Sequence, residues 1–248
     1  MLALVRPPSP DLARGLLTHI DRQPVDVNLA RRQWENYVSA LQGVGWQTLE
    51  VPAAPANPDS VFVEDTMVVW RDRAVMARPG APERRGEIPD AEQVIRSLGY
   101  QVTTIRGPAS LDGGDVLKID GHLYVGVGGR TSPDAVQQLA AGLGLPATAV
   151  PVSKVLHLKS GVTALPDGTV IGYLPLVDDA SVWESFLPVP EEGGAHVVVI
   201  DDSTVLMAAS APRTAALLAD RGLRVVVVDI GEFEKLEGCV TCLSVRLR

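Results

Sequence analysis

The chain has 248 residues, of which 46% are hydrophobic and 21% charged, and its formal net charge is -8 at pH 7. These proportions are typical of a globular protein, and an acidic chain with no long basic run and no long apolar stretch does not favour nucleic acid or a membrane as partner. Two cysteines do not make a disulfide framework, and the opening MLALVRPPSP lacks the apolar core of a signal peptide, so we expect a cytoplasmic protein.

In chain order, stretches with a helical pattern end in glycine and lead into short β-branched strands. Four segments share this form: ALQGVGWQTLEVP, VIRSLGYQVTTIR, LAAGLGLPATAVPV and LLADRGLRVVVVDI. A glycine after a helix favours a left-handed helix end, and the Val-rich or Thr-rich run after it favours a buried strand. The first of these helices is expected around Arg31 to Gln42.

Hairpins separate the helical segments. Their sequences are MVVWRDRAVMARP, DVLKIDGHLYVGV, VTALPDGTVIGYL and VVVIDDSTVLMAA, each with two apolar runs around a polar turn. The turns centre near Asp72, Asp120, Asp167 and Asp202, so the hairpins recur after 48, 47 and 35 residues. A period of this size indicates a repeated unit, here hairpin, helix and strand.

The two chain ends complete a fifth unit. The C-terminal VTCLSVRLR would pair with the N-terminal MLALVRP, and the first helix follows. We therefore predict an α/β protein with a single domain over residues 1–248, in which five ββαβ units form a ring around a central channel. The alternative is an open α/β sheet with short helices. Because no Gly-x-Gly-x-x-Gly follows a strand, nothing favours a dinucleotide-binding sheet.

Acidic residues interrupt two of the apolar strand patterns. Asp59, Glu64 and Asp65 lie in NPDSVFVEDTMVVW, and Asp112 and Asp115 bracket two glycines in SLDGGDVLKIDG. Carboxylates are costly to bury unless a cation pairs with them, but each cluster alone is explained equally well by a solvated strand end or a tight turn. Both clusters open a hairpin in successive repeats, so in a ring they would face the same channel. Such a site suits a cation such as guanidinium.

One of the four histidines occupies the equivalent position of the next repeat. His19, His122 and His196 lie in a loop, a hairpin turn and a strand start, where structural roles suffice. His157 in KVLHLKSGVTAL precedes the third hairpin, as the acidic clusters precede the first two. A lone histidine is more often structural, but this position makes His157 a candidate acid and base.

Both cysteines lie in GCVTCLSVRLR at the C-terminus. A redox Cys-x-x-Cys normally opens a helix, and a zinc site needs about four ligands, neither of which this sequence provides. The neighbouring residues have a strand pattern, which would direct Cys239 and Cys242 to opposite faces. Cys242 then opens the remaining unit at the place held by His157 and the acidic clusters. A cysteine, a histidine and carboxylates that converge make Cys242 the candidate nucleophile and Cys239 a bystander.

Six ordered motifs together resemble one family. PDSVFVEDTMVV, ARPGAPERRGE, LDGGDVL, VGGRTS, LHLKS and TCLSV, which cover the chain from about Pro58 to its end, are similar to dimethylarginine dimethylaminohydrolase of the guanidine-modifying pentein superfamily. The resemblance implies a five-bladed α/β propeller with pseudo-fivefold symmetry around a central active-site channel. This agrees with the five units counted above.

The resemblance also implies catalytic roles. Cys242 would attack the guanidinium carbon, His157 would protonate the leaving amine and then activate water, and Asp112 would orient the histidine and hold the guanidinium. The reaction implied is hydrolysis of Nω-methylated L-arginine to L-citrulline and dimethylamine or methylamine, through a covalent thiouronium on cysteine. It requires no metal and no organic cofactor.

The remaining implied roles concern substrate binding. Asp65, with Glu64 beside it, matches a carboxylate on the substituted guanidinium, and Asp59 matches a residue at the α-amino end. Arg84 and Arg130 match the pair that binds the α-carboxylate, a task for which the planar guanidinium is well shaped.

Two segments depart from the family pattern. Cys239 stands where an aliphatic residue is expected, and strand geometry would disfavour a disulfide with Cys242. The segment 7–25, PPSPDLARGLLTHIDRQPV, corresponds to a lid loop but has a distinctive sequence, with Leu12, Leu16 or Leu17 to cover the substrate.

We therefore expect an enzyme whose partner is a small molecule, as a monomer or homodimer, with no nucleic acid or membrane partner. Two alternatives are an arginine deiminase that releases ammonia, whose family members are longer, and a non-catalytic pentein binding protein, which would lack the cysteine, histidine and carboxylates.

Overall fold

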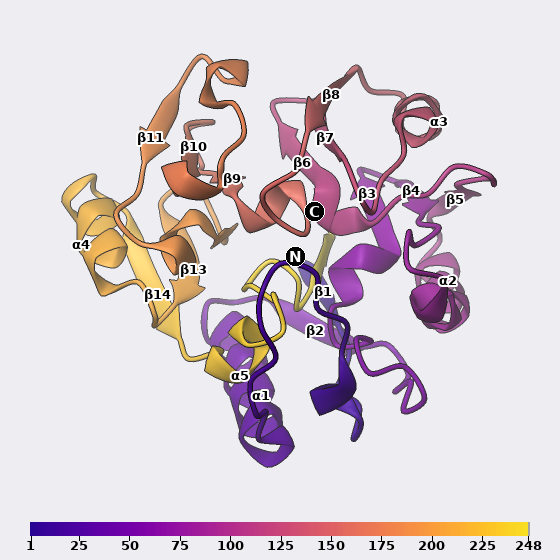
Figure 1. The fold of residues 1–248 in the computed structure, drawn as a ribbon, viewed down its shortest axis with the longest axis horizontal. Coiled ribbons are helices and arrows are strands. Elements are labelled where there is room, and N and C mark those ends of the chain that lie inside the picture. Colours follow the sequence, from indigo (N-terminus) through magenta and orange to yellow (C-terminus); the bar gives the residue numbers. More distant parts are fainter. Residues whose placement is uncertain (248) are drawn as a thin grey trace.

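The computed structural model describes residues 1–247, and within this range the strands form five three-stranded sheets arranged as a ring (Figure 1). The strands nearest the ring centre are β3 (Met67–Trp70), β6 (Val116–Ile119), β9 (Val162–Ala164), β12 (Val197–Val199) and β15 (Val245–Leu247). The middle strands are β1 (Leu2–Val5), β4 (Arg73–Met76), β7 (His122–Val127), β10 (Val170–Gly172) and β13 (Thr204–Ala208). The outer strands are β2 (Gln47–Glu50), β5 (Gln101–Thr104), β8 (Ala147–Pro151), β11 (Phe186–Pro188) and β14 (Arg224–Val228).

Every sheet has the same pairing pattern. The inner strand runs antiparallel to the middle strand, and the outer strand runs parallel to the middle one, as β3, β4 and β5 do. A parallel neighbour needs a crossover, and helices provide it in four units. These helices are α1 (Val27–Gly43), α2 (Ile88–Ser97), α3 (Pro133–Leu143) and α4 (Pro212–Asp220). In the fourth unit, the single turns η6 (Leu174–Leu176) and η7 (Ala180–Val182) replace the helix.

The two chain ends form one unit, as predicted; in chain order it is the first unit of the ring. β1 pairs with β15 through Leu2 and Leu247 in antiparallel register and with β2 in parallel register. In Figure 1 both termini lie near the centre of the ring. The ring of five units is confirmed over residues 1–247, with turns in place of the helix in the fourth unit. The last residue of the predicted domain, Arg248, lies outside the described residues.

The predicted helix-glycine-strand segments also form. The glycine between helix and outer strand has positive φ in each of them, for example 88° at Gly45 and 69° at Gly144. Only glycine adopts this left-handed conformation at no steric cost, so these residues end the helices. At the other end of α1, the Asp26 carboxylate accepts hydrogen bonds from the N–H groups of Asn28 and Leu29 and caps the helix.

Apolar side chains hold neighbouring units together. One buried cluster joins Val68 and Val75 of the second unit to Val116, Leu123 and Leu139 of the third. This cluster therefore packs one unit of the ring against the next. Within residues 1–247, no helix is long and apolar enough to cross a membrane.

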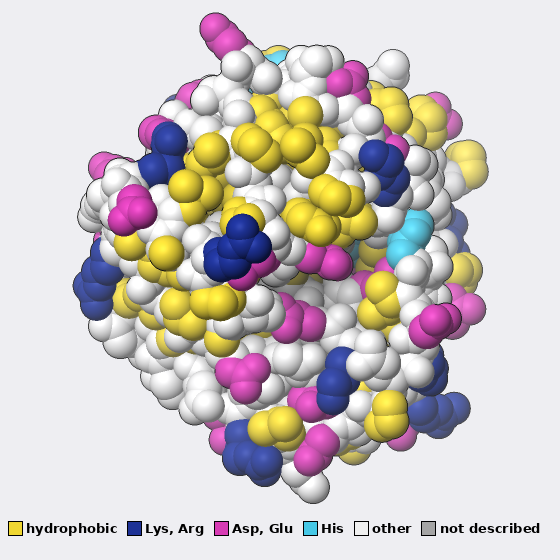
Figure 2. Space-filling model, turned by 60° about the vertical axis from the view of Figure 1, so that its left-hand side comes forward, with side chains coloured by type: hydrophobic (Ala, Val, Ile, Leu, Met, Phe, Trp, Pro, Cys, Tyr) yellow, Lys and Arg dark blue, Asp and Glu magenta, His cyan; other side chains and the backbone are white. Residues whose placement is uncertain are grey.

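The outer surface mixes charges of both signs. On the face drawn in Figure 2, basic side chains stand apart among acidic and apolar ones. Among the described side chains on this face, the basic ones form no continuous area.

Candidate active site

Most of the predicted site residues lie in or beside turns that precede the inner strands, as expected for Asp112 and His157. Asp65 and Cys242, whose sequence pattern suggested strands, also lie in such turns. Single 3-10 turns lead into three of these strands: η2 (Val63–Thr66) into β3, η4 (Gly113–Asp115) into β6, and η5 (Leu158–Ser160) into β9. A further turn, 240–243, leads into β15. A turn exposes its side chains at the end of the channel, whereas a strand would alternate them between faces. The ring therefore brings four sequence-distant turns together.

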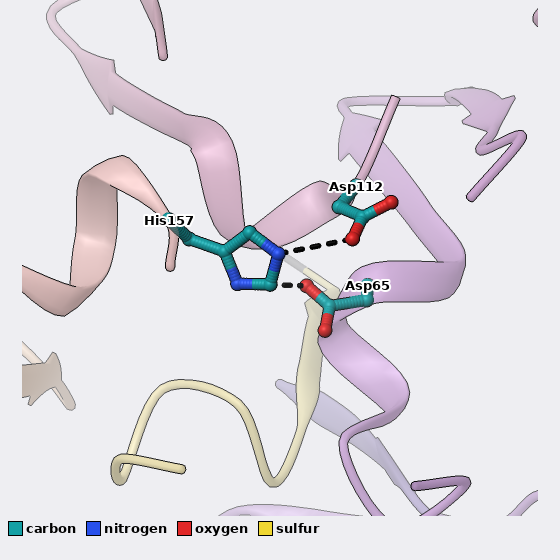
Figure 3. Close-up of side chains that lie close together, drawn as sticks. All are labelled: Asp65, Asp112 and His157. Carbon is teal, nitrogen blue, oxygen red and sulfur yellow. Dashed lines mark hydrogen bonds and ion pairs between the residues drawn. The ribbon is translucent and has the colours of Figure 1, made fainter. Parts of the chain in front are cut away.

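One edge of a buried histidine ring faces two carboxylates (Figure 3). The Nε2 of His157 is 3.0 Å from Asp112 Oδ2, and its Nδ1 is 3.8 Å from Asp65 Oδ1. All three side chains are nearly inaccessible to solvent. The imidazole is thus oriented by its hydrogen bond with Asp112, while Asp65 lies close enough to act on its charge.

The carboxylates favour the charged form of this histidine. Burial lowers the pKa of His157, but the Asp65 carboxylate and the hydrogen bond with Asp112 outweigh it and raise the pKa to about 9. Burial likewise opposes ionisation of Asp65, yet His157 and Arg84 lower its pKa to about 2. At neutral pH the site therefore holds an imidazolium, which is the form that donates a proton.

Gly114 allows the three groups to meet. A Cβ at this position would lie 2.5 Å from His157 Nδ1 and 2.7 Å from Asp65 Oδ1, closer than van der Waals contact allows. The N–H of Gly114 donates to Asp65 Oδ1 at 2.7 Å. The second glycine of LDGGD thus lets the backbone approach side chains of two other units.

Arg84 is a buried guanidinium that protein groups largely neutralise. Its Nη1 donates to Asp65 Oδ2 at 2.6 Å, and its Nε and Nη2 donate to the two oxygens of Glu87 at 2.9 and 2.8 Å. Its Nη2 also donates to the carbonyls of Asp59 and Phe62. These bonds occupy Nε and Nη2 and leave one Nη1 hydrogen for another acceptor. The sequence analysis missed Glu87, although its i,i+3 spacing from Arg84 in PERRGE is a salt-bridge signal.

Arg130 makes fewer hydrogen bonds with the described residues than Arg84 does. Its Nη1 lies 3.6 Å from Asp112 Oδ2, is buried, and makes no hydrogen bond with the described residues. Its Nη2 donates weakly to Thr18 Oγ1 at 3.4 Å. A half-buried guanidinium with a buried, unused donor is suited to receive a carboxylate.

The cysteine geometry differs from the prediction. Cys239 and Cys242 lie on a turn closed by the hydrogen bond from Cys242 N–H to the Cys239 carbonyl at 3.1 Å, and their Sγ atoms are 3.2 Å apart. The strand interpretation placed the side chains on opposite faces and was wrong, because a turn of four residues folds positions i and i+3 toward each other. The hydrogen bond between the sulfurs lowers the pKa of Cys239 and raises that of Cys242.

Seven of the eight predicted site residues come together. Six of them line or contact one small cavity with Cys242, namely Asp59, Asp65, Arg84, Asp112, Arg130 and His157. The exception is Glu64, whose Oε1 binds Lys159 Nζ and Arg246 Nη2, each at 2.6 Å. These three side chains line a separate cavity of about 560 Å³ along the inner strands. Glu64 and Asp65 are adjacent in sequence, but successive residues of the η2 turn point in different directions.

The segment 7–25 covers the cavity. The N–H of Leu16 donates to both oxygens of Asp59 at 3.2 and 3.1 Å, and Leu16 lines the cavity. The N–H groups of Thr18 and His19 donate to the Glu237 carboxylate at 2.6 and 2.9 Å. No sequence signal singled out Glu237, since its partners are backbone groups more than two hundred residues away.

Asp65, Asp112 and His157 also form the one described group of potential metal ligands. Their ligand atoms lie within 4.8 Å of one another. Arg84 and Arg130 already pair with the two carboxylates, so the protein itself supplies the positive charge that these groups require.

Comparisons with known proteins show which family the chain resembles. The family model described as arginine deiminase matches residues 50–161. The N(G),N(G)-dimethylarginine dimethylaminohydrolase of Streptomyces coelicolor is 62% identical over 99% of this chain and 96% of that protein. The protein of the same name from Pseudomonas aeruginosa is 32% identical over 98% of both chains.

Solved structures give the same result. A crystal structure of a dimethylarginine dimethylaminohydrolase adduct with S-methyl-L-thiocitrulline matches with a TM-score of 0.92, 31% identity and coverage of 99% of each chain. A cysteine-to-serine mutant from Pseudomonas aeruginosa complexed with citrulline also has a TM-score of 0.92, at 31% identity, covering 99% of this chain and 98% of that one. Both the sequence and the fold therefore place the chain in the dimethylarginine dimethylaminohydrolase family.

Proposed function

We propose that this chain hydrolyses Nω-methylated L-arginine to L-citrulline and dimethylamine or methylamine, with Cys242 as nucleophile, His157 as acid and base, and Asp112 as the residue that orients His157. The observation that carries this proposal is the convergence of Cys242, a protonated His157 and Asp65 on one cavity. A guanidinium needs carboxylates, its central carbon needs a nucleophile, and its leaving amine needs a proton.

Substrate binding activates the nucleophile. At neutral pH an ordinary thiol is mostly protonated, but a guanidinium beside Cys242 favours the thiolate because opposite charges attract strongly in a buried site. Asp65 and Asp112 offset the charge of the bound guanidinium and fix its carbon for attack. The thiolate adds to that carbon and forms a tetrahedral adduct.

His157 then moves the protons. Its Nδ1, the nitrogen not engaged by Asp112, donates a proton to the methylated nitrogen, and the C–N bond breaks to release dimethylamine or methylamine. The neutral imidazole next takes a proton from water, which attacks the thiouronium carbon. Collapse of this second adduct breaks the C–S bond, releases L-citrulline and restores the thiol, so atoms and charge balance.

The other end of the substrate is an amino acid. We propose that Asp59 binds its α-ammonium group and that Arg84 and Arg130 bind its α-carboxylate. The buried, unused donor of Arg130 supports this role most directly, and the remaining Nη1 hydrogen of Arg84 adds a second donor. Glu64, which is held by Lys159 and Arg246, would support the turn that carries Asp65.

A lid must open to admit the substrate. The cavity has a volume of about 10 Å³, room for about one water molecule, and the N–H of Leu16 occupies the Asp59 carboxylate. We therefore propose residues 7–25 as a lid on a single domain, with Leu16 as the cover in the closed state. Opening frees Asp59 for the ammonium group, and closure shields the thiouronium from bulk water.

We further propose a cytoplasmic monomer or homodimer that acts on a small molecule, without nucleic acid or membrane partners. The net charge of -8 supports this, because anionic polymers and anionic lipid surfaces repel an acidic protein. Size-exclusion chromatography with light scattering distinguishes the two oligomeric states.

The decisive experiment measures citrulline release from asymmetric dimethylarginine, monomethylarginine and arginine in parallel. Cys242→Ser is the variant, and Cys239→Ser is the matched control because its hydroxyl can replace the hydrogen bond to Cys242. The proposal predicts citrulline with dimethylamine or methylamine from the wild type and from Cys239→Ser, and none from Cys242→Ser. The match to the arginine deiminase family model makes arginine the critical competitor: turnover of arginine alone would transfer the assignment to a deiminase.

A further inference from the structure

The turn that carries the nucleophile holds a second thiol that the hydrolysis does not use. Cys239 is 3% exposed and does not line the cavity, yet its Sγ is 3.2 Å from Cys242 Sγ. Its other hydrogen-bond partners among the described residues are Thr241 Oγ1 at 3.2 Å and the Lys159 carbonyl at 4.0 Å, and the charges of His196 and Glu64 also act on it. No binding or acid-base task explains its position.

We propose that Cys239 and Cys242 are a dithiol site for oxidation by hydroperoxides, and that the resulting disulfide blocks the nucleophile reversibly. The claim that the disulfide inactivates the enzyme rests on the proposed role of Cys242. The formation of the disulfide itself does not depend on that role.

The local backbone permits the bond. A disulfide requires the two sulfurs to approach to about 2.05 Å, roughly 1.2 Å closer than they are now. The two residues face each other across a four-residue turn, which side-chain rotation and a small turn adjustment can close. On a strand the same spacing would have made the bond sterically inaccessible, so the turn is what creates the site.

The oxidant reaches one sulfur of the pair. Cys242 lines the active-site cavity, whose volume of about 10 Å³ admits a molecule near the size of water but not an amino acid. Hydrogen peroxide is the smallest hydroperoxide and is only slightly larger than water, so a small opening of the lid admits it. Cys239 lies behind Cys242, so it is placed to resolve the product and not to meet the oxidant first.

The chemistry balances in two steps. Cys239, the thiol of lower pKa, takes the proton of Cys242 as Cys242 Sγ attacks one oxygen of hydrogen peroxide. The O–O bond breaks, and Cys242 sulfenic acid and hydroxide form. The Cys239 sulfur then attacks the sulfenic sulfur, an S–S bond forms, and the sulfenic oxygen leaves as water with the Cys239 proton. Two electrons pass from the two thiols to the peroxide, and a dithiol reductant reverses the change by thiol-disulfide exchange.

The dithiol pair would protect Cys242 from irreversible oxidation as well as allow its reversible inactivation. A lone Cys242 sulfenic acid meets further peroxide and proceeds to sulfinic acid, which thiol reductants do not restore. A resolving thiol 3.2 Å away competes with that second oxidation because no diffusion is required. Oxidised wild-type protein is therefore expected to recover its activity, whereas protein without Cys239 is not.

The test treats the full chain with graded hydrogen peroxide and follows intact mass, free thiols and citrulline formation, before and after dithiothreitol. Wild type should lose about 2 Da and both thiols, lose activity, and regain all three with the reductant. Cys239→Ser should gain about 32 Da and stay inactive. Cys239→Ala repeats the comparison with a side chain that fits a small buried site, in case the serine variant folds poorly.

One result would overturn the proposal. If wild type gains about 32 Da at the same peroxide concentration as Cys239→Ser and remains inactive after dithiothreitol, Cys239 does not resolve the sulfenic acid. The mass and thiol readouts concern the protein alone. They therefore stand even if the methylarginine assignment fails, and the two failures remain distinguishable.

Discussion

The most incisive substitution in this protein is Gly114→Ala, which adds a single methyl group between the general acid and its carboxylate. The new Cβ would lie 2.5 Å from His157 Nδ1 and 2.7 Å from Asp65 Oδ1. Ordinary contact begins near 3.4 Å, so these atoms must move away by about 0.7 to 0.9 Å. Neither can move freely, because Asp112 holds the imidazole and Arg84 holds the carboxylate.

We expect Gly114→Ala to lower both the free energy of unfolding and kcat. Overpacking of a buried site costs about 1–3 kcal/mol of unfolding free energy. A displacement of this size at a proton donor lowers kcat by about 10²-fold, which corresponds to about 2.7 kcal/mol in the activation free energy. KM should change less, since Asp59 and Arg130 are not displaced.

The assay pairs urea unfolding with steady-state citrulline formation. Gly129→Ala is the matched control, because its Cβ meets nothing within 4 Å although it precedes Arg130. It should retain wild-type stability and rate. If Gly114→Ala kept kcat within about twofold while folding normally, the spacing of His157 and Asp65 would not matter for catalysis, and the proposed role of His157 would be refuted.

Three further predictions follow from single contacts. Tyr37→Phe removes a buried hydroxyl that donates to the Val240 carbonyl at 2.9 Å, and should cost about 1 kcal/mol in urea unfolding; an unchanged midpoint would show that this bond does not anchor the cysteine turn. The pKa of His157 is raised from 6.5 to about 9, so the protonated histidine stabilises the folded protein fully below pH 6.5. This contribution to the free energy of unfolding is lost as the pH rises through 9. The free energy of unfolding of the wild type should therefore fall by about 3 kcal/mol across this pH range relative to that of His157→Gln. Parallel profiles of unfolding free energy against pH for the two proteins would contradict the charge assignment. Glu237→Gln weakens the acceptor of two lid N–H groups and should speed hydrogen exchange at Thr18, whereas equal exchange rates would argue against a latch at this carboxylate.

The repeat pattern made the architecture predictable. Glycine after a helix and β-branched runs around polar turns are local signals, and they recur at a regular period in this chain. Pairing of the chain ends was also predictable, because four complete repeats leave the two terminal strands without another partner. The fourth unit shows the limit of the approach, since short turns η6 and η7 replace the expected kind of helix there.

Local sequence was a poorer guide to the turns that carry the site. VFVED and VTCLSV have the apolar alternation of strands, so strand geometry was assigned to Asp65 and Cys242. In the structure both precede their strands, and the backbone there is shaped by contacts with other units, such as the bond from Glu64 N–H to the Cys242 carbonyl at 3.1 Å. Tertiary hydrogen bonds of this kind override a local strand preference.

By itself the sequence determined the ring of units, the family and the types of residue in the site, because periodicity and motifs depend on neighbours in the chain. Only the tertiary structure decided which groups meet. It separated Glu64 from Asp65, joined Arg84 to Glu87, placed Leu16 on Asp59 and brought two sulfurs within 3.2 Å. These outcomes depend on side-chain directions in short turns and on partners from other units, and a difference of one residue in a turn reverses such a direction.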